Sequence, residues 1–141
     1  MKLLVDTNVF LDVILERKDL MRESAAVLDA IEDGRAKGYV ASHALTTIHY
    51  IVAKANGRAA AATAISDVLD LCEVVALNQA DFQRALALGL KDFEDAVQVT
   101  AALHVSADYL VSRNEKDFKG SPIDVRSPTT IAVLLSVPGS P

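Results

Sequence analysis

The sequence predicts an α/β protein with three layers, α/β/α, in which helices cover both faces of a short-stranded parallel sheet. Apolar segments of strand length alternate with longer helical segments, as they do in parallel sheets joined by right-handed crossovers. The chain is 51% apolar and 23% charged, a composition that excludes a disordered protein. Its 141 residues have the size of one domain, which we expect to span 1–136, with a frayed tail at 137–141.

In the N-terminal half of the chain, the expected strands and helices alternate. The expected elements are a strand at 2–5, a helical turn from Val9, a helix at 21–32, a strand at 39–41, a helix from Ser42 to about 55 and a helix at 58–71. Apolar residues recur at helical spacing through 21–32, and Gly34 and Gly38 follow as a stop signal. Ser42 is a favourable N-cap, and Asn56-Gly57 is typical of a helix end.

The C-terminal half continues this alternation. The expected elements are a strand at 73–77, a helix from 79 to about 88, a helix at 93–104, a strand at 109–112, a strand at 123–125 and a last helix from Pro128. Asn78 can cap the helix that follows it, because its side chain accepts from a free backbone N–H. Pro128 suits the first helical position, where a backbone N–H would have no partner.

Composition and charge narrow the classes of function. No apolar run approaches the roughly 18 residues that span a bilayer, and the run before Asp6 is too short for a signal peptide, so we expect no membrane partner. The single cysteine, Cys72, cannot form an internal disulfide, and we expect a cytoplasmic protein with a buried thiol. The net charge of −5 argues against bulk electrostatic binding of nucleic acid, although carboxylate-bound cations reverse the sign locally.

Acidic segments at strand ends mark the candidate site. They are Asp6 to Asn8 after the first strand, Asp92 to Asp95 at a helix start, and Ser112 to Asp117 after the fourth strand. Because open parallel sheets bind ligands outside the carboxyl ends of their strands, we expect these segments to converge. Like charges brought together need a cation or raised pKa values, and oxygen ligands without an organised Cys or His set indicate Mg²⁺ or Mn²⁺. Each Asp taken alone could be an ordinary helix N-cap.

The same segments resemble motifs of the PIN-domain nucleases. Leu4 to Asp12 is similar to the opening motif of that family, Asp92 to Ala96 to its third motif and Asp108 to Phe118 to its fourth, in order and in spacing. The resemblance covers nearly the whole chain, and it implies a PIN-like fold and an Mg²⁺- or Mn²⁺-dependent endoribonuclease, which is a hydrolase. Small single-domain members are mostly VapC-type toxins that an antitoxin protein holds in check. Members commonly dimerise, so we expect a homodimer.

Residue by residue, the resemblance implies a site with fewer carboxylates than usual. The first, third and last acids of the family map onto Asp6, Asp95 and Asp117, which are expected to hold the metal ion. Asn114 stands where the fourth motif has its first acid, and Thr47 falls at the place of the second-motif acid. Both are expected to act in catalysis by orienting water, and neither adds charge. Whether one ion binds or two is left open.

Three functions compete for this pattern. The leading hypothesis is a metal-dependent ribonuclease, the toxin of a toxin-antitoxin pair, in which Asn8 also orients water and the ion activates water against an RNA phosphodiester. The alternative is a catalytically silent PIN-like module that binds RNA or protein, which the neutral Thr47 and Asn114 favour. A phosphate-transfer protein also places an Asp after its first strand, but the chain lacks the second Asp of dehalogenases, due at Asn8, and the late lysine of receivers.

Basic and histidine side chains are weaker candidates. Five of them could steer phosphates, although solvated surface is their ordinary role: Lys54, Arg58, Arg113, Lys116 and Lys119. His49 is close enough to Thr47 in sequence to border the site. For His43 and His104, a packing or surface role is expected.

Overall fold

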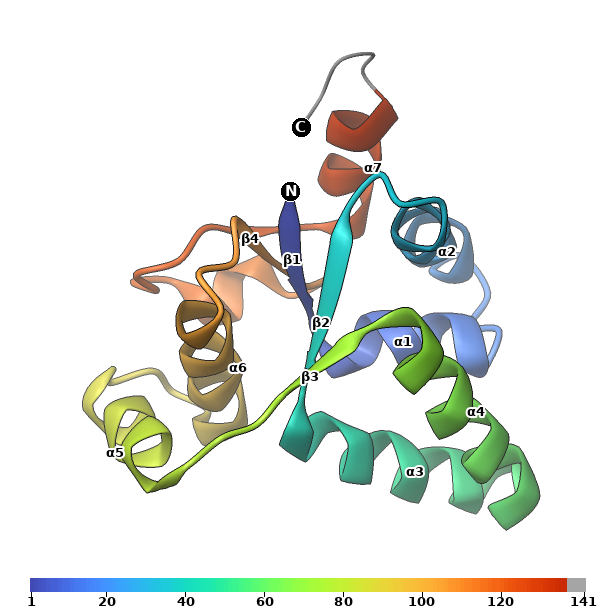
Figure 1. The fold of residues 1–141 in the computed structure, drawn as a ribbon, viewed down its shortest axis with the longest axis horizontal. Coiled ribbons are helices and arrows are strands. Elements are labelled where there is room, and N and C mark those ends of the chain that lie inside the picture. Colours follow the sequence, from blue (N-terminus) through green and yellow to red (C-terminus); the bar gives the residue numbers. More distant parts are fainter. Residues whose placement is uncertain (137–141) are drawn as a thin grey trace.

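The computed structural model describes residues 1–136, in which five strands form one sheet and seven α-helices surround it (Figure 1). In chain order the elements are β1 (Lys2–Val5), α1 (Thr7–Ile14), α2 (Met21–Glu32), β2 (Lys37–Ala41), α3 (Ser42–Asn56), α4 (Arg58–Leu71), β3 (Glu73–Val75), α5 (Gln79–Ala87), α6 (Phe93–His104), β4 (Tyr109–Val111), the 3-10 turn η1 (Glu115–Phe118), β5 (Val125–Arg126) and α7 (Pro128–Ser136). The tail expected at 137–141 lies outside the described residues. None of the described helices is long and apolar enough to cross a membrane.

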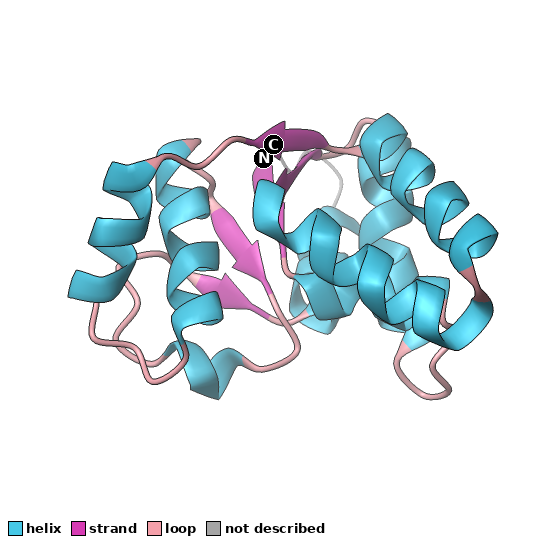
Figure 2. Cartoon of the chain, turned by 90° about the horizontal axis from the view of Figure 1, so that it is seen from below, coloured by secondary structure: helices cyan, strands magenta, loops and turns pink. Residues whose placement is uncertain are grey.

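The strands lie in the order β3-β2-β1-β4-β5, and every neighbouring pair is parallel. Leu4 of the central strand β1 is paired with Tyr39 of β2 on one side and with Leu110 of β4 on the other. Helices cover both faces of the sheet (Figure 2), and α6 packs on β1 and β4. The predicted three-layer class is confirmed. Because the chain passes from one side of β1 to the other before β4, the carboxyl ends of β1 and β4 are where such a sheet binds ligands.

The core is built around β1, whose Leu3, Leu4 and Val5 are completely buried. Phe10 of α1 and Ile48 of α3 belong to the same buried cluster. Burying an apolar side chain of this size contributes about 1.5–3 kcal/mol relative to leaving it in water. The strand that ends at the candidate site is therefore firmly anchored.

Gly38 lies inside β2 rather than in a stop signal before it. A Cβ at this position would lie 2.8 Å from Ile31 Cδ1 and 2.9 Å from Cys72 Sγ, so only glycine lets α2 and the end of α4 pack this closely on the strand. β2 begins at Lys37, earlier than predicted, because Lys37 already pairs with Lys2 of β1. Burial raises the pKa of the Cys72 thiol to about 12, which agrees with the packing role expected for it.

Boundaries of β3, β4 and β5 also differ from the prediction: β4 ends at Val111, one residue before the expected Ser112, and β5 extends to Arg126. β3 ends at Val75, earlier than expected, because its neighbour β2 gives way to α3 after Ala41 and offers no further partner. β5 begins later than expected, because the Ser121 hydroxyl donates to the carbonyl of Ile123 and accepts from its N–H. These local bonds hold Ile123 in a turn, where it cannot join the ladder.

Candidate active site

Hydrogen bonds join the carboxyl ends of β1 and β4 at one carboxylate. Asp6 follows β1, and its N–H donates to the carbonyl of Val111 in β4 over 2.9 Å. Ser112, the residue after β4, donates its hydroxyl to Asp6 Oδ2 over 2.8 Å. Gln98 of α6 donates its side-chain amide to Asp6 Oδ1 over 3.2 Å. Three segments that are far apart in sequence therefore meet at Asp6.

Asp6 is also the N-cap of α1. Its Oδ1 accepts from the N–H of Thr7 over 2.8 Å, which is why the helix begins at Thr7 rather than at Val9. Asp6 is only 6% exposed. Burial raises the pKa of its carboxyl above the ordinary value, while the donors Ser112 and Thr7 oppose that rise. A buried carboxylate that accepts three hydrogen bonds is held in one orientation.

Gln98 is a site residue that the sequence analysis missed. It is completely buried, and its Nε2 also lies 3.2 Å from Thr7 Oγ1. Its Oε1 has no hydrogen-bond partner among the described residues. The one signal in the sequence was spacing, because Gln98 lies three positions after Asp95 and hence on the same face of α6.

Asp95 and Asp117 line one pocket of about 500 Å³. Asp95 lies in the first turn of α6, after the N-cap Asp92, whose side chain accepts the N–H of Asp95 over 3.0 Å. Asp117 lies in η1. Burial first, and then the negative charges of Asp92, Asp6, Asp117 and Glu94, raise the pKa of Asp95 to about 7. Asp95 therefore experiences the charges of both other predicted metal ligands.

The chemistry of this donor set fits a hard divalent cation. Burial and then the neighbouring carboxylates raise the pKa of Asp95, and a cation among the carboxylates would relieve their repulsion. Within residues 1–136, no three His, Cys, Asp or Glu side chains lie close enough together to form a preassembled metal group. Mg²⁺, however, usually binds proteins through one or two carboxylates and keeps several waters. Asp95 and Asp117 supply that number of carboxylates, and metal binding by these two residues or by all three aspartates stays a prediction.

The two neutral candidates, Asn114 and Thr47, differ in whether hydrogen bonds connect them to a predicted metal ligand. Asn114 lies close to Asp6, because its N–H donates over 3.1 Å to the Ser112 hydroxyl that Asp6 accepts. Its side chain is exposed. Thr47 lies on α3, and its hydroxyl is 3.5 Å from the carbonyl of His43 one turn earlier. In the described part of the chain, no hydrogen bond links Thr47 to a predicted metal ligand, so its role as a water ligand stays a prediction.

Some of the basic candidates line the pocket, whereas Arg113 pairs with a buried carboxylate instead. Lys116 and Lys119 line the pocket of Asp95 and Asp117, and Lys91, which the sequence analysis did not single out, lines it with them. Arg113, for which a solvated surface position was the ordinary expectation, is instead partly buried: its Nε lies 2.7 Å from Asp12 Oδ2, and its side chain is 24% exposed.

Comparison with known proteins gives one family. The family model described as the PIN domain matches residues 2–116, which is most of the chain. A relative from Aquifex aeolicus (strain VF5), named "Ribonuclease VapC1", is 26% identical over 129 residues, and the match covers 88% of each chain.

Solved structures show the same fold. VapBC2 from Rickettsia felis, bound to a DNA fragment from its promoter, matches with a TM-score of 0.71 and 18% identity over 90% of this chain and 98% of that one. A toxin-antitoxin complex from Klebsiella pneumoniae matches with a TM-score of 0.67 and 24% identity, covering 89% of this chain and 96% of that one. At these identities the likeness concerns the backbone fold.

Proposed function

The chain belongs to the PIN-domain family, and from this premise we propose that it is a metal-dependent endoribonuclease, the toxin of a toxin-antitoxin pair. The observation that carries the proposal is the proximity of Asp6, Asp95 and Asp117 near the carboxyl ends of β1 and β4. Burial first, and then neighbouring carboxylates that include Asp6 and Asp117, raise the pKa of Asp95. The relative named as a ribonuclease supports the reaction class. We propose that one PIN-like domain spans 1–136.

Asp95 and Asp117, together with Asp6, would hold Mg²⁺ or Mn²⁺. Such an ion supplies a Lewis acid that polarises a phosphodiester and activates water for in-line attack. The chain's own residues orient the ligands: Ser112 and Gln98 fix the Asp6 carboxylate through their hydrogen bonds. We assign water-orienting roles to Asn114, which is coupled to Asp6 through Ser112, and to Thr47 and Asn8 by family resemblance alone.

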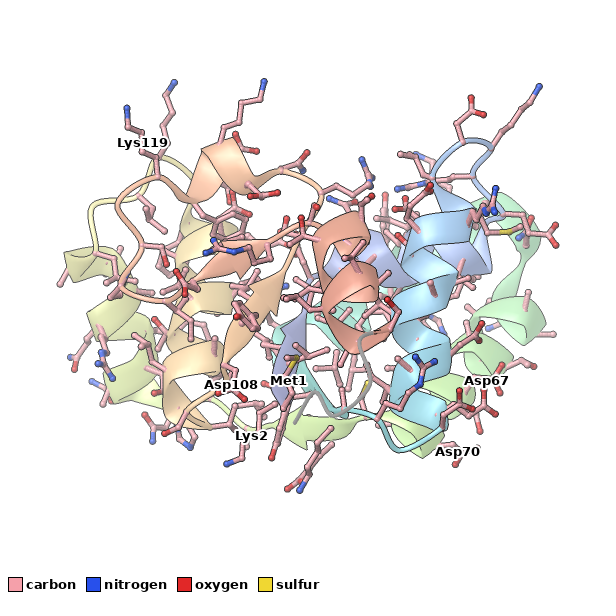
Figure 3. The ribbon with its side chains drawn as sticks, turned by 90° about the horizontal axis from the view of Figure 1, so that it is seen from above. Met1, Lys2, Asp67, Asp70, Asp108 and Lys119 are labelled. Carbon is pink, nitrogen blue, oxygen red and sulfur yellow. The ribbon has the colours of Figure 1, made fainter. Side chains whose placement is uncertain are left out.

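RNA is the proposed substrate, and the lysines around the pocket support it. Lys91, Lys116 and Lys119 line the same pocket as Asp92, Asp95 and Asp117, so three lysines offset the charge of three aspartates there in a chain whose net charge is −5. Lysines contact backbone phosphates without reading sequence. Figure 3 shows Lys119 on the side of the molecule opposite Lys2 and Asp108. On that opposite side, the backbone N–H of Lys2 donates to the carboxylate of Asp108 over 2.7 Å.

Two protein partners are proposed. The solved structures of similar fold include toxin-antitoxin complexes, which supports an antitoxin partner. A homodimer is supported by an exposed apolar patch formed by Phe82, Leu86 and Phe93, in which Leu86 is 70% exposed and the two Phe ring centroids lie 6.4 Å apart. Sedimentation velocity of the purified protein tests whether two copies of the chain form this homodimer. We place the protein in the cytoplasm, where the free thiol of Cys72 stays reduced.

RNA cleavage tests the enzyme against the silent module. Purified full-length protein is incubated with total RNA in Mg²⁺, Mn²⁺ or EDTA, beside the Asp95→Asn variant. The proposal predicts cleavage by wild type in either ion and none in EDTA, with Asp95→Asn inactive throughout. The neutral Thr47 and Asn114 favour the alternative, a PIN-like binding module. RNA that stays intact under every condition, although wild type binds it, would support that alternative.

A further inference from the structure

The carboxylate of Asp12, which lies outside the pocket, is completely buried and pairs with two arginine side chains. Asp12 of α1 is 0% exposed. Its Oδ2 lies 2.7 Å from Nε of Arg113 and accepts the hydroxyl of Ser24 over 2.9 Å, while its Oδ1 accepts from Nη1 of Arg17 over 3.3 Å. Arg17 follows α1, Ser24 belongs to α2 and Arg113 follows β4. The Asp12 carboxylate therefore ties the segment after β4 to α1 and α2.

Arg113 sits inside the segment that carries the site. It lies between Ser112, which donates to Asp6, and Asn114, whose N–H donates to Ser112. From 113 to 117, Arg113 is the one residue whose side chain makes an ion pair or hydrogen bond with another element of the described structure. At the far end, Phe118 is buried. The exposed stretch with Asp117 is thus held by an ion pair at its start and an apolar anchor at its end.

We propose that the Asp12–Arg113 ion pair is a positioning device that fixes the segment 112–117 and thereby the Asp117 carboxylate. Its catalytic consequence rests on the proposed function, whereas its effect on the segment does not. A planar guanidinium holds a carboxylate in a more defined geometry than a flexible ammonium does. The Nε–H of Arg113 forms no hydrogen bond within the described residues, so its contact with Asp12 is an ion pair at 2.7 Å. Buried ion pairs often contribute little net stability, because desolvation offsets the attraction, but a unique partner geometry can specify conformation.

Arg17 makes the matched control. It pairs with the same buried carboxylate but lies outside the site segment, so Arg17→Gln and Arg113→Gln each remove one cation from Asp12. If Asp12 only needs positive charge for folding, the two variants behave alike. If Arg113 positions the segment, only Arg113→Gln loosens it. Arg113→Lys, which keeps the charge, is the second variant should Arg113→Gln fold poorly.

Amide hydrogen exchange of the metal-free protein tests the proposal without RNA. The informative amides are those of Asn114, which donates to Ser112, and Asp117, which donates to the Asn114 carbonyl over 2.9 Å. We expect Arg113→Gln, and Arg113→Lys less strongly, to speed their exchange about tenfold or more. The amide of Leu110, inside β4, serves as the reference and should not change. Unchanged exchange at Asn114 and Asp117, or an equal rise in Arg17→Gln, would overturn the proposal.

Steady-state kinetics then test the catalytic consequence. Removing a residue that supports a metal ligand typically lowers activity about 10- to 100-fold. We therefore expect Arg113→Gln to lower kcat by that factor and to leave KM little changed. Arg17→Gln should retain the kcat and the KM of wild type. A raised KM at unchanged kcat would overturn positioning in favour of direct contact between Arg113 and RNA. If wild type cleaves no RNA, the proposed function fails while the exchange measurement still decides whether the ion pair fixes the segment.

Discussion

Ser112 donates its hydroxyl to Oδ2 of Asp6 over 2.8 Å, so the residue that follows β4 fixes the carboxylate that follows β1. Both residues are buried. The same hydroxyl oxygen accepts the N–H of Asn114 over 3.1 Å. One side chain therefore couples two motif segments that are more than a hundred positions apart in the sequence.

Ser112→Ala tests this coupling through stability. The substitution leaves the buried Asp6 carboxylate without one of its donors, and an unsatisfied buried acceptor costs about 1–3 kcal/mol. We expect the free energy of unfolding, from denaturant titration in EDTA, to fall by that amount. Ser66→Ala, at an exposed position of α4, is the control and should be nearly neutral. Equal effects of the two substitutions would mean that the Ser112 bond contributes nothing.

Asp95 makes the stability of the metal-free protein depend on pH. Because its pKa is raised from 3.8 to about 7, its contribution to stability is complete below the unfolded-state value and is lost as the pH rises through about 7. We therefore expect the melting temperature of wild type in EDTA to fall relative to Asp95→Asn between about pH 4 and about pH 7.

The comparison with Asp95→Asn also cancels the titration of His43, which changes stability with pH in the direction opposite to Asp95. Burial lowers the pKa of His43, so its contribution to stability is lost as the pH falls. His43 is present in both proteins, and the difference between them isolates Asp95. A difference in melting temperature that does not vary with pH would show that burial and the neighbouring carboxylates do not raise the pKa of Asp95.

The lysines of the pocket should set the salt dependence of RNA binding. Each phosphate contact to a single strand contributes about 0.7 to the slope of log affinity against log salt concentration, so Lys91→Gln, Lys116→Gln and Lys119→Gln should each lower the slope by about that amount. Fluorescence anisotropy of a labelled RNA oligonucleotide in EDTA measures it. Lys18→Gln, at an exposed position between α1 and α2, is the control. A similar loss in that variant would place RNA elsewhere on the surface.

Thr47→Glu tests whether Thr47 occupies the second-motif position of the site. If it does, the added carboxylate supplies one more hard ligand, and the Mn²⁺ concentration that stabilises the protein should fall several-fold. Thr46→Glu, at the exposed neighbouring position, is the matched control and should leave the titration unchanged. Identical Mn²⁺ titrations for both variants, with the fold intact by circular dichroism, would exclude Thr47 from the site.

The parts of the site that follow strand ends could be predicted from the sequence. Asp6 and Ser112 come directly after short apolar runs, and in a parallel sheet the carboxyl ends of all strands lie at one edge. Asp95 lies in the first turn of a helix that apolar residues at helical spacing, such as Val97 and Ala101, predict. Strand and helix periodicity therefore located these residues without tertiary information.

The contacts between elements could not be predicted in this way. Gln98 lies among apolar residues of α6, and only the docking of that helix against β1 brings its amide to Asp6. The Asp12–Arg113 pair joins residues 101 positions apart, and no local pattern indicates such a partner. The end of β3 likewise depends on where its partner strand β2 ends, and the start of β5 depends on the hydrogen bonds of the Ser121 turn. These features depend on packing between distant segments, which periodicity does not encode.

We propose that the aspartates at this edge bind a divalent cation, and a substitution of Asp117 tests this proposal most directly. Its side chain is exposed and lines the pocket, so Asp117→Asn should leave the fold intact. Glu115→Gln removes the same charge from a neighbouring exposed position of η1 and is the matched control. The measurement is the rise in melting temperature when millimolar Mn²⁺ replaces EDTA, because an ion that binds only the folded state stabilises it by mass action. We predict equal rises for wild type and Glu115→Gln, and little or none for Asp117→Asn. An equal rise in all three proteins, or none in wild type, would contradict the claim.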